Sequence, residues 1–225
     1  MRMSSALLAS AAFLIIAGAA SEARAEPQPD SKLHVSLSLE TRYLDTLYFN
    51  EAVSDEPALQ ASASYDLTEH VYVSAYAYTG FTKAFRDDSS EYGFELGVQK
   101  EVAKDTTLTV ATGRYANYWG QGFDAGDTYV RASVQHGPAT ASVSVLKGMS
   151  NTALLNFSYD ITVAEKVTLT PSIAYISREE RTNFGLTARY WATDHLSVGV
   201  KVVLPEDYRT GSRKVYAAAM MSYRF

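Results

Sequence analysis

Hydrophobic and polar residues alternate along most of the chain after residue 30. In residues 33–43, the apolar Leu33, Val35, Leu37 and Leu39 are separated by polar residues. Successive side chains of a β-strand point to opposite faces, so this period of two predicts a strand with one apolar and one polar face. The same alternation recurs in the segments EYGFELGVQ, VTLTPSIAYIS, NFGLTARYW and LSVGVKVVL. The pattern therefore predicts an all-β protein.

The alternating segments predict about twelve strands of about ten residues, the length that a tilted strand needs to cross a bilayer. We expect them at 33–45, 57–67, 70–79, 91–101, 106–117, 127–136, 139–148, 152–162, 166–177, 182–192, 195–204 and 213–225. Their connections alternate between short turns and mostly longer, acidic or glycine-rich loops. This asymmetry is typical of a closed antiparallel outer-membrane β-barrel, with turns in the periplasm and loops outside. An even strand number also places both termini in the periplasm.

The chain ends on a strand residue with no polar tail. Met221, Tyr223 and Phe225 share one face of the last predicted strand. This arrangement resembles the carboxy-terminal assembly signal of bacterial outer-membrane β-barrels, which implies recognition by the barrel-assembly machinery. We expect the last strand to pair with the first, because closure leaves no unpaired strand edge in lipid.

The amino terminus has the pattern of a secretory signal peptide. Arg2 precedes the apolar run ALLASAAFLIIAGAA, and Ala23 and Ala25 have the spacing of a signal-peptidase site. We therefore expect residues 1–25 to be a signal peptide and residues 26–225 to form one barrel domain. An uncleaved anchor is the alternative, but the apolar run is short for a membrane span and Pro27 and Pro29 follow it closely.

Composition narrows the function classes. The 225 residues are 47% hydrophobic and carry a formal net charge of −5, so there is no basic excess for a nucleic-acid backbone. The chain has no cysteine, which excludes disulfides and thiolate metal sites. A soluble periplasmic barrel or sandwich would alternate in the same way, with its apolar face turned inward.

Aromatic residues favour the membrane interpretation, because tyrosine rings suit the level of the lipid headgroups. Many of the 16 tyrosines lie near predicted strand ends: Tyr43, Tyr65, Tyr92, Tyr118, Tyr159, Tyr175, Tyr190 and Tyr223. Small residues such as Ala61, Ala63, Ala75 and Ala77 also recur on the apolar faces. We expect a bacterial outer-membrane protein surrounded by outer-membrane lipid and lipopolysaccharide.

Residues 55–80, DEPALQASASYDLTEHVYVSAYAYTG, resemble the early hairpin of the TorF-type family of outer-membrane proteins. In that family Pro-Ala-Leu-Gln opens a strand and a tyrosine-rich strand returns. The resemblance covers roughly a tenth of the chain at motif level. It implies a fold and a location rather than a substrate.

The sequence shows no catalytic constellation for an outer-membrane hydrolase, the enzymatic alternative. The His-x-Ser-Asn-Gly type motif of the twelve-stranded outer-membrane phospholipase is absent, and His70, His136 and His195 fall at short turns. Acidic pairs such as Asp87 and Asp88 suit solvated loops, with a divalent-cation or protease role as the alternative. We therefore expect no enzyme activity, no cofactor and no metal site.

The polar faces of the strands are expected to line the barrel lumen. They carry ten ionisable residues, namely Glu40, Arg42, Asp66, Glu95, Arg131, Asp160, Arg189, Lys201, Lys214 and Arg224. If these residues line an open path, the protein is a small-solute channel with a narrow, slightly basic lumen for an anionic or hydroxylated solute. In that case Glu40, Arg42, Glu95, Arg131, Asp160, Arg189 and Lys201 are the lumen-lining candidates.

Two alternatives remain open for the lumen. The charged residues could instead pair across it and fill it, which would make the protein a structural or interaction barrel. Tyr72, Tyr76 and Tyr78 share a face whose direction the pattern does not fix. Inward, they would form an aromatic slide for a sugar; outward, they would belong to the interfacial girdle.

Overall fold

The protein is a closed β-barrel in a computed structural model that describes residues 32–45, 49–53, 55–80, 90–117, 126–148, 150–207 and 209–225. The strands are β1 (Leu33–Glu40), β2 (Leu44–Asp45), β3 (Glu51–Ala52), β4 (Ala58–Asp66), β5 (Val71–Gly80), β6 (Ser90–Ala103), β7 (Thr106–Asn117), β8 (Gly126–His136), β9 (Ala139–Gly148), β10 (Thr152–Tyr159), β11 (Ile161–Ala164), β12 (Val167–Ile176), β13 (Arg181–Trp191), β14 (Leu196–Leu204) and β15 (Tyr216–Arg224). No helix among these residues is long and apolar enough to cross a membrane.

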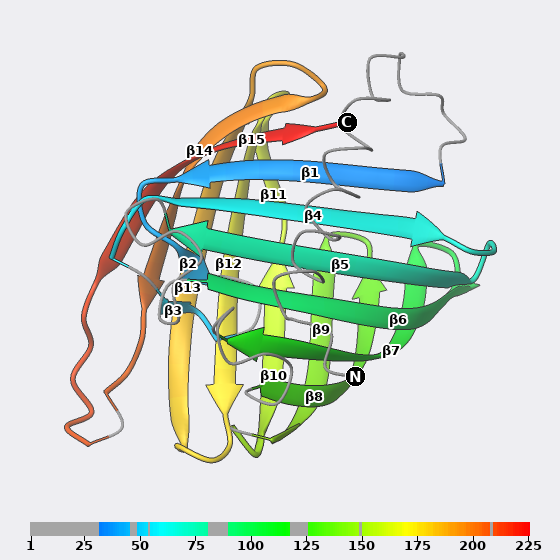
Figure 1. Cartoon of the computed structure of the whole chain (residues 1–225). Coiled ribbons are helices and arrows are strands. Elements are labelled where there is room, and N and C mark those ends of the chain that lie inside the picture. Colours follow the sequence, from blue (N-terminus) through cyan, green and yellow to red (C-terminus); the bar gives the residue numbers. More distant parts are fainter. Residues whose placement is uncertain are drawn as a thin grey trace, which may run out of the picture.

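Antiparallel pairing carries the sheet around a complete circle. The order runs β10-β9-β8-β7-β6-β5-β4-β1-β15-β14-β13-β12-β11, and β10 also pairs with β12. Because β10 and β11 are one strand interrupted at Asp160, the wall has twelve strands (Figure 1). The predicted all-β class, the closed barrel and the pairing of the last strand with the first are confirmed.

The two ends of the barrel differ in their connections. At one end, which we call the turn end, tight turns join β6 to β7, β8 to β9 and β11 to β12. The beginning of β1 and the end of the chain also lie there, since the Phe225 amide donates to the Val35 carbonyl at 3.0 Å. The opposite end, the loop end, carries the connection from β12 to β13 and the long connection from β14 to β15.

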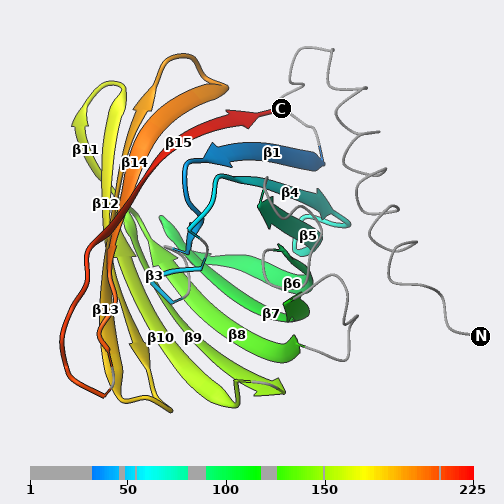
Figure 2. The ribbon, with the colours of Figure 1, turned by 60° about the vertical axis from the view of Figure 1, so that its left-hand side comes forward.

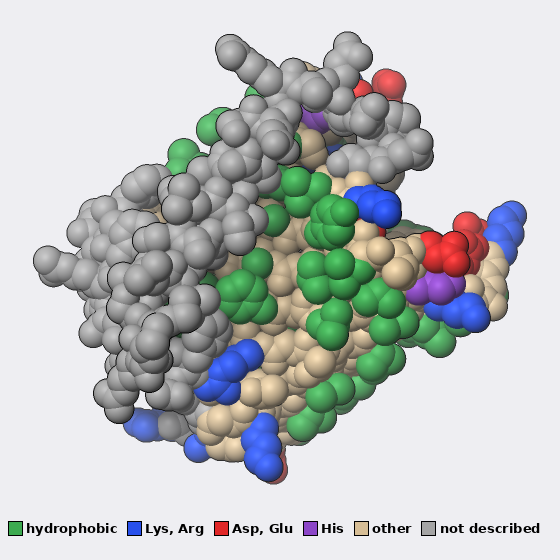
Figure 3. Space-filling view, turned by 45° about the vertical axis from the view of Figure 1, so that its right-hand side comes forward, with side chains coloured by type: hydrophobic (Ala, Val, Ile, Leu, Met, Phe, Trp, Pro, Cys, Tyr) green, Lys and Arg blue, Asp and Glu red, His purple; other side chains and the backbone are tan. Residues whose placement is uncertain are grey.

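The outer face of the wall is apolar. Phe94, Leu96 and Val98 of β6 are exposed, as are Val198 and Val200 of β14. Figure 3 shows hydrophobic side chains spread over the visible wall, while acidic, basic and histidine side chains gather together at its edge. An outward apolar band is the opposite of what a water-soluble barrel presents.

Most of the expected girdle tyrosines lie on this outer face. Five are exposed to a similar degree: Tyr65, Tyr159, Tyr175, Tyr190 and Tyr223. Tyr92 is buried beside Ala116, and Tyr118 lies outside the described residues. The girdle prediction is wrong for Tyr43, which is buried against Tyr78 inside the barrel.

The first strand is shorter than predicted. It ends at Glu40 rather than at residue 45, because the chain then turns into the barrel and forms the β2–β3 hairpin. Tyr43 has the parity of the outward-facing Leu39, but it is buried inside the lumen because the chain leaves the wall after Glu40. The predicted strand at 213–225 likewise begins at Tyr216.

The direction of the tyrosine face on β5 is inward. The Tyr72 hydroxyl donates to Glu95 at 2.6 Å, and the Tyr76 hydroxyl donates to Glu91. The third member, Tyr78, is buried. These three rings therefore belong to the lumen rather than to the girdle.

Candidate permeation pathway

A hairpin of the chain occupies part of the lumen. Its described residues are 44–45 and 49–52, with Leu44 paired to Ala52, and Figure 2 shows the segment around β3 lying inside the ring of strands. Leu44 is fully buried against Val203 and Ala218, which face inward from β14 and β15. Hydrophobic burial of this kind holds the hairpin against one side of the wall.

A buried ion pair contacts the hairpin at Leu44. Lys201 Nζ is 2.6 Å from Glu40 Oε1, and both side chains are almost completely inaccessible to solvent. The same two groups bond the backbone of Leu44: Lys201 Nζ donates to its carbonyl at 3.4 Å, and its amide donates to Glu40 Oε2 at 3.5 Å. The pair therefore connects β1, β14 and the hairpin.

Phe49 and Asn50 of the hairpin are held by amide and hydroxyl groups of β12 and β13. Asn183 Nδ2 donates to the Phe49 carbonyl at 2.7 Å, and Ser172 Oγ donates to Asn50 Oδ1 at 3.0 Å. Asn50 is buried and has a φ of 49°, a left-handed conformation that asparagine tolerates better than most residues. A Cβ at Gly185 would lie only 2.5 Å from Asn50 Oδ1, so glycine there leaves the asparagine its place.

Phe49 packs against an apolar cluster on the far wall. The cluster consists of five buried residues from β7, β8, β9, β10 and β12, namely Tyr115, Tyr129, Leu146, Leu154 and Ile176. With Leu44 on β14 and β15 and Phe49 on this cluster, the hairpin reaches across the lumen. It therefore narrows the interior at the level of Phe49.

A cavity of about 840 Å³ remains beside the hairpin. Its lining includes His34, Ser36 and Phe225 from the turn end, and Arg178 and Glu179 from the loop end. One continuous space therefore runs between residues of the two ends of the barrel.

One wall of the cavity is built from tyrosines. Tyr43, Tyr76, Tyr78, Tyr115 and Tyr129 all line it. Tyr43 stacks on Tyr78 with ring centroids 4.0 Å apart and an interplanar angle of 22°. Burial, followed by the nearby carboxylates, raises the pKa of Tyr43 well above its ordinary value, so this ring stays a neutral phenol.

Two glycines of β6 make room for the tyrosine rings of β5. A Cβ at Gly97 would lie 2.3 Å from the Tyr72 ring, and one at Gly93 would lie 2.4 Å from the Tyr76 ring. The rings thus lie across the glycines of the neighbouring strand. Aromatic rings that cover a cross-strand glycine are a known stabilising arrangement in sheets.

The other wall of the cavity is rich in small polar groups. Gln60, Ser62, Ser64 and Ser74 of β4 and β5 line it, and Ser62 shares a hydrogen bond of 2.7 Å with Ser36. Facing aromatic and hydroxyl surfaces suit a solute that has both an apolar face and hydroxyl groups.

Two of the predicted lumen residues form a bidentate ion pair. Arg131 donates to both carboxylate oxygens of Glu95, at 2.6 Å and 3.2 Å. The Tyr72 and Tyr129 hydroxyls donate to the same carboxylate. Together with Glu40 and Lys201, this makes two separate ion pairs, which account for four of the seven lumen-lining candidates.

The other six charges of the predicted inward set, all within the described part of the chain, form no ion pair with one another. Arg42 pairs with Asp55 at 3.2 Å, and Asp160 accepts a bond of 2.6 Å from Thr170. The other acid of the inward set, Asp66, accepts from His34 at 3.3 Å. The remaining inward bases of the set lie over aromatic rings: Lys214 over Tyr216, and Arg189 and Arg224 over Trp191.

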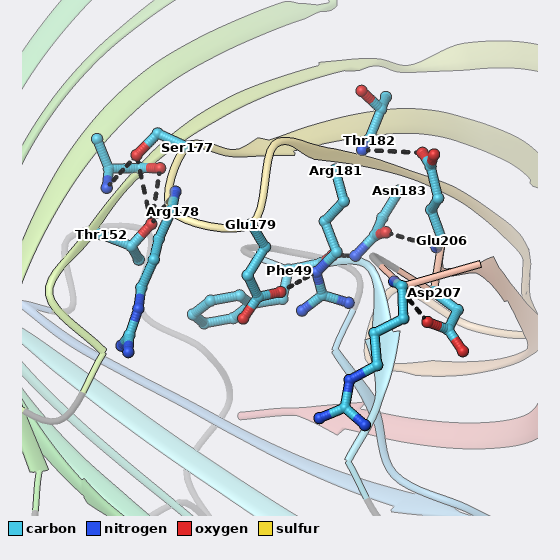
Figure 4. Close-up of polar contacts among 12 residues, drawn as sticks. Phe49, Thr152, Ser177, Arg178, Glu179, Arg181, Thr182, Asn183, Glu206 and Asp207 are labelled. Atoms are coloured by element: carbon cyan, nitrogen blue, oxygen red, sulfur yellow. Dashed lines mark hydrogen bonds and ion pairs between the residues drawn. The ribbon is translucent and has the colours of Figure 1, made fainter. Parts of the chain in front are cut away.

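At the loop end, three charged side chains line the cavity: Arg178, Glu179 and Arg181. Figure 4 shows Glu179 meeting Arg181 close to Phe49. Arg178 Nη1 donates to the Ser150 carbonyl at 2.7 Å, and Arg213 pairs with Glu206 at 2.8 Å.

Sequence reasoning missed several cavity residues. Glu91 shares the parity of Glu95 on the same strand, a signal that could have placed it inward. Asp45 and Phe49 belong to the inserted hairpin, and Arg178 and Arg181 to the connection at the loop end. No periodic pattern marks residues of connections as lumen-facing. Among the residues that the structure describes, no group of three or more His, Asp or Glu could hold a metal ion.

Comparison of the sequence with protein-family models and with curated proteins found no match. Solved structures do share the fold. KdgM porin has a TM-score of 0.59 at 10% identity, over 85% of this chain and 99% of that chain. NanC porin has a TM-score of 0.52 at 8% identity, over 84% and 98%. Omp33 of Acinetobacter baumannii, an outer membrane protein, has 0.50 at 10% identity, over 87% and 98%. The fold is that of outer-membrane porins, as predicted.

Proposed function

We propose that the protein is a passive channel of the bacterial outer membrane through which small hydroxylated or anionic solutes pass. The observation that carries this proposal is the cavity of about 840 Å³ lined by residues of both barrel ends. A solute would move between the tyrosine wall and the polar wall formed by β4 and β5. The hairpin would set the width of the path at Phe49.

The comparisons agree with a channel and with an outer-membrane location. KdgM porin, which shares the fold, has been solved in complex with oligogalacturonate, an anionic and hydroxylated chain. In the orientation that we propose, the turn end faces the periplasm and the loop end faces outside, as in other barrels with this asymmetry. The exposed tyrosines would then contact the headgroups of lipid and lipopolysaccharide.

We propose that the lumen is slightly basic and that its excess positive charge lies at its two ends. The cavity lining contains three arginines, Arg178, Arg181 and Arg224, of which two are at the loop end. Its acidic residues are Asp45, Glu91 and Glu179. Because Arg131 and Lys201 are paired with carboxylates, they would add little net field to the path.

Phe49→Ala should widen the path. Removing the ring takes away the only aromatic side chain by which the described part of the hairpin reaches the far wall cluster. We expect single-channel conductance in planar bilayers to increase severalfold, and proteoliposomes to swell faster in small sugars. Leu155→Ala, on the exposed outer face, is the matched control and should leave conductance unchanged. Equal conductance of wild type and Phe49→Ala would contradict a constriction at this residue.

A structural or interaction barrel with a filled lumen is the second candidate. The inserted hairpin and the two buried ion pairs favour it, because together they occupy a large part of the interior. This candidate predicts a folded wild type that does not conduct and does not admit sugars. The bilayer measurement on the wild type therefore decides between the two.

We propose no catalytic activity for the protein. All four histidines lie at the turn end, and His34, His136 and His195 contact Asp66, Thr106 and the Arg224 carbonyl, respectively. The remaining histidine, His70, is near Glu69 at 3.5 Å. In the proposed orientation this end faces the periplasm, away from the outer rim where a lipid- or peptide-cleaving barrel would work.

The assembly signal also remains a proposal, with Met221, Tyr223 and Phe225 recognised by the barrel-assembly machinery. Tyr223 and Phe225 contact each other edge to face at 4.8 Å, and Phe225 closes the ladder to β1. Phe225→Asp should be secreted but poorly inserted, with a severalfold loss of heat-modifiable barrel in the outer-membrane fraction. A normal amount of folded barrel would contradict the assembly role.

A further inference from the structure

Arg189 occupies an interior position of β13 near the turn end. Its neighbours on the same face, Asn183 and Thr187, are buried inside the barrel, whereas Phe184 and Leu186 on the other face are exposed. Arg189 pairs in register with Gly199 of β14 and with Thr168 of β12. Its side chain therefore leaves the inner face of the wall from a strand that is paired on both sides.

This guanidinium makes no hydrogen bond or ion pair with the described residues. Its Nε is buried and has no partner, and the group lies over the ring of Trp191, whose centroid is 5.5 Å from Cζ. Arginine has five N–H donors and stays charged at physiological pH. Arg189 as a whole is half-buried, and a buried N–H donor such as its Nε with no acceptor calls for an explanation.

A second guanidinium lies against the same tryptophan. Arg224 Cζ is 3.8 Å from the Trp191 ring centroid, and Arg224 lines the cavity. Its described acceptor is the Asp194 carbonyl, at the long distance of 3.5 Å. Two cations thus share one aromatic neighbour, with no carboxylate bonded to either among the described residues.

The acids near Arg189 are engaged elsewhere. Glu40 is held by Lys201 at 2.6 Å, and Asp160 accepts from Thr170 at 2.6 Å. Two neighbouring cations repel each other, and an anion placed between them would remove that repulsion and satisfy their donors. Guanidinium groups in particular match the planar geometry of carboxylate and phosphate oxygens.

We propose that Arg189 and Arg224, beside Trp191, form a binding site for a small carboxylate or phosphate anion at the turn end of the lumen. This proposal rests on the proposed channel function. A solute moving inward would bind at this site last, before its release into the periplasm. Trp191 would keep the two guanidinium groups in place by cation–π contact. Solutes bearing such an anionic group would be held there, whereas neutral sugars would pass.

Tryptophan fluorescence tests the site directly, because the chain has two tryptophans. In a Trp119→Phe variant, Trp191 is the only tryptophan that contributes to the fluorescence. The folded protein is titrated with inorganic phosphate at constant ionic strength, with sodium chloride as the reference salt. We expect a saturable change with phosphate and none with chloride. Arg189→Gln and Arg224→Gln should each weaken the apparent affinity by about tenfold or more, as expected for lost charge-assisted hydrogen bonds.

Arg114→Gln is the matched control, since Arg114 lies opposite the exposed Phe94 on the outer face. It should bind phosphate like the parent protein. Because Arg189 makes no hydrogen bond or ion pair with the described residues, Arg189→Gln should also leave the free energy of unfolding unchanged or higher. A purely structural role would instead lower it and would contradict the proposal.

Two results would overturn the site: a phosphate response that does not saturate, or one that is equal in Arg189→Gln, Arg224→Gln and Arg114→Gln. The channel proposal is judged separately, by conductance. Conduction without saturable phosphate binding would reject the site and keep the channel. Saturable binding without conduction would reject the channel and keep the anion site.

Discussion

Lys201→Met is expected to lower the free energy of unfolding by about 3–5 kcal/mol, the usual cost of removing one partner of a buried ion pair. Glu40 would be left nearly inaccessible to solvent with its partner gone. The Leu44 carbonyl would also lose its bond to Lys201 Nζ. Since both groups hold the hairpin, we expect the hairpin to leave the wall and the single-channel conductance to rise.

Equilibrium unfolding in lipid bilayers and single-channel recordings measure the two effects. The double variant Glu40→Gln with Lys201→Met is the control, because it removes both charges and keeps the volume similar. It should recover most of the lost stability, as neutral replacements of buried pairs often do. If Lys201→Met is as stable as the wild type, the ion pair does not hold the interior together.

Val200→Arg should cost about 2–4 kcal/mol, the range for a cation on the lipid face near the middle of a bilayer. Val200 is 46% exposed on the outside of β14. It is the central residue of this strand and pairs with Ala219 of β15 and Ala188 of β13, so it lies well within the wall. A folded barrel in bilayers would therefore place the new charge in hydrocarbon.

Gln60→Arg is the matched change on the inner face, since Gln60 lines the cavity. It should not carry this lipid penalty, because the cavity gives the new side chain space and polar neighbours. The comparison uses unfolding free energies of both variants in the same lipid. Equal losses would show that the two faces of the wall are not lipid and lumen.

The wall of the barrel was predictable because it depends on local alternation. One face of each strand meets lipid and the other meets the lumen, so every strand repeats the same period of two. Predicted strands such as 106–117 and 139–148 therefore match β7 and β9 at both ends. The pairing of β1 with β15 also followed, since an outer-membrane strand cannot leave an edge unpaired.

The seven lumen-lining candidates were chosen by the same parity, and none of them is among the residues that line the cavity. Arg131 and Glu95 were both placed inward from parity, and they meet across the intervening β7. Parity alone did not show that they would meet, because the partners of an inward charge depend on curvature and side-chain reach. Parity also left open whether the β5 tyrosines face the lumen or the lipid. In the structure their rings lie across Gly93 and Gly97, on the inner face of β6.

Local alternation was therefore enough to predict the closed barrel, its two faces and its two unlike ends. What fills the lumen depends on contacts between residues far apart in the chain. Tyr43 has the outward parity of Leu39 and Leu44 the inward parity of Glu40. Both lie inside the barrel, because the chain turns into the lumen after Glu40 and buries them against Tyr78 and Val203. Glu40 and Lys201 are 161 residues apart, and a contact over that distance exists only once the barrel has closed.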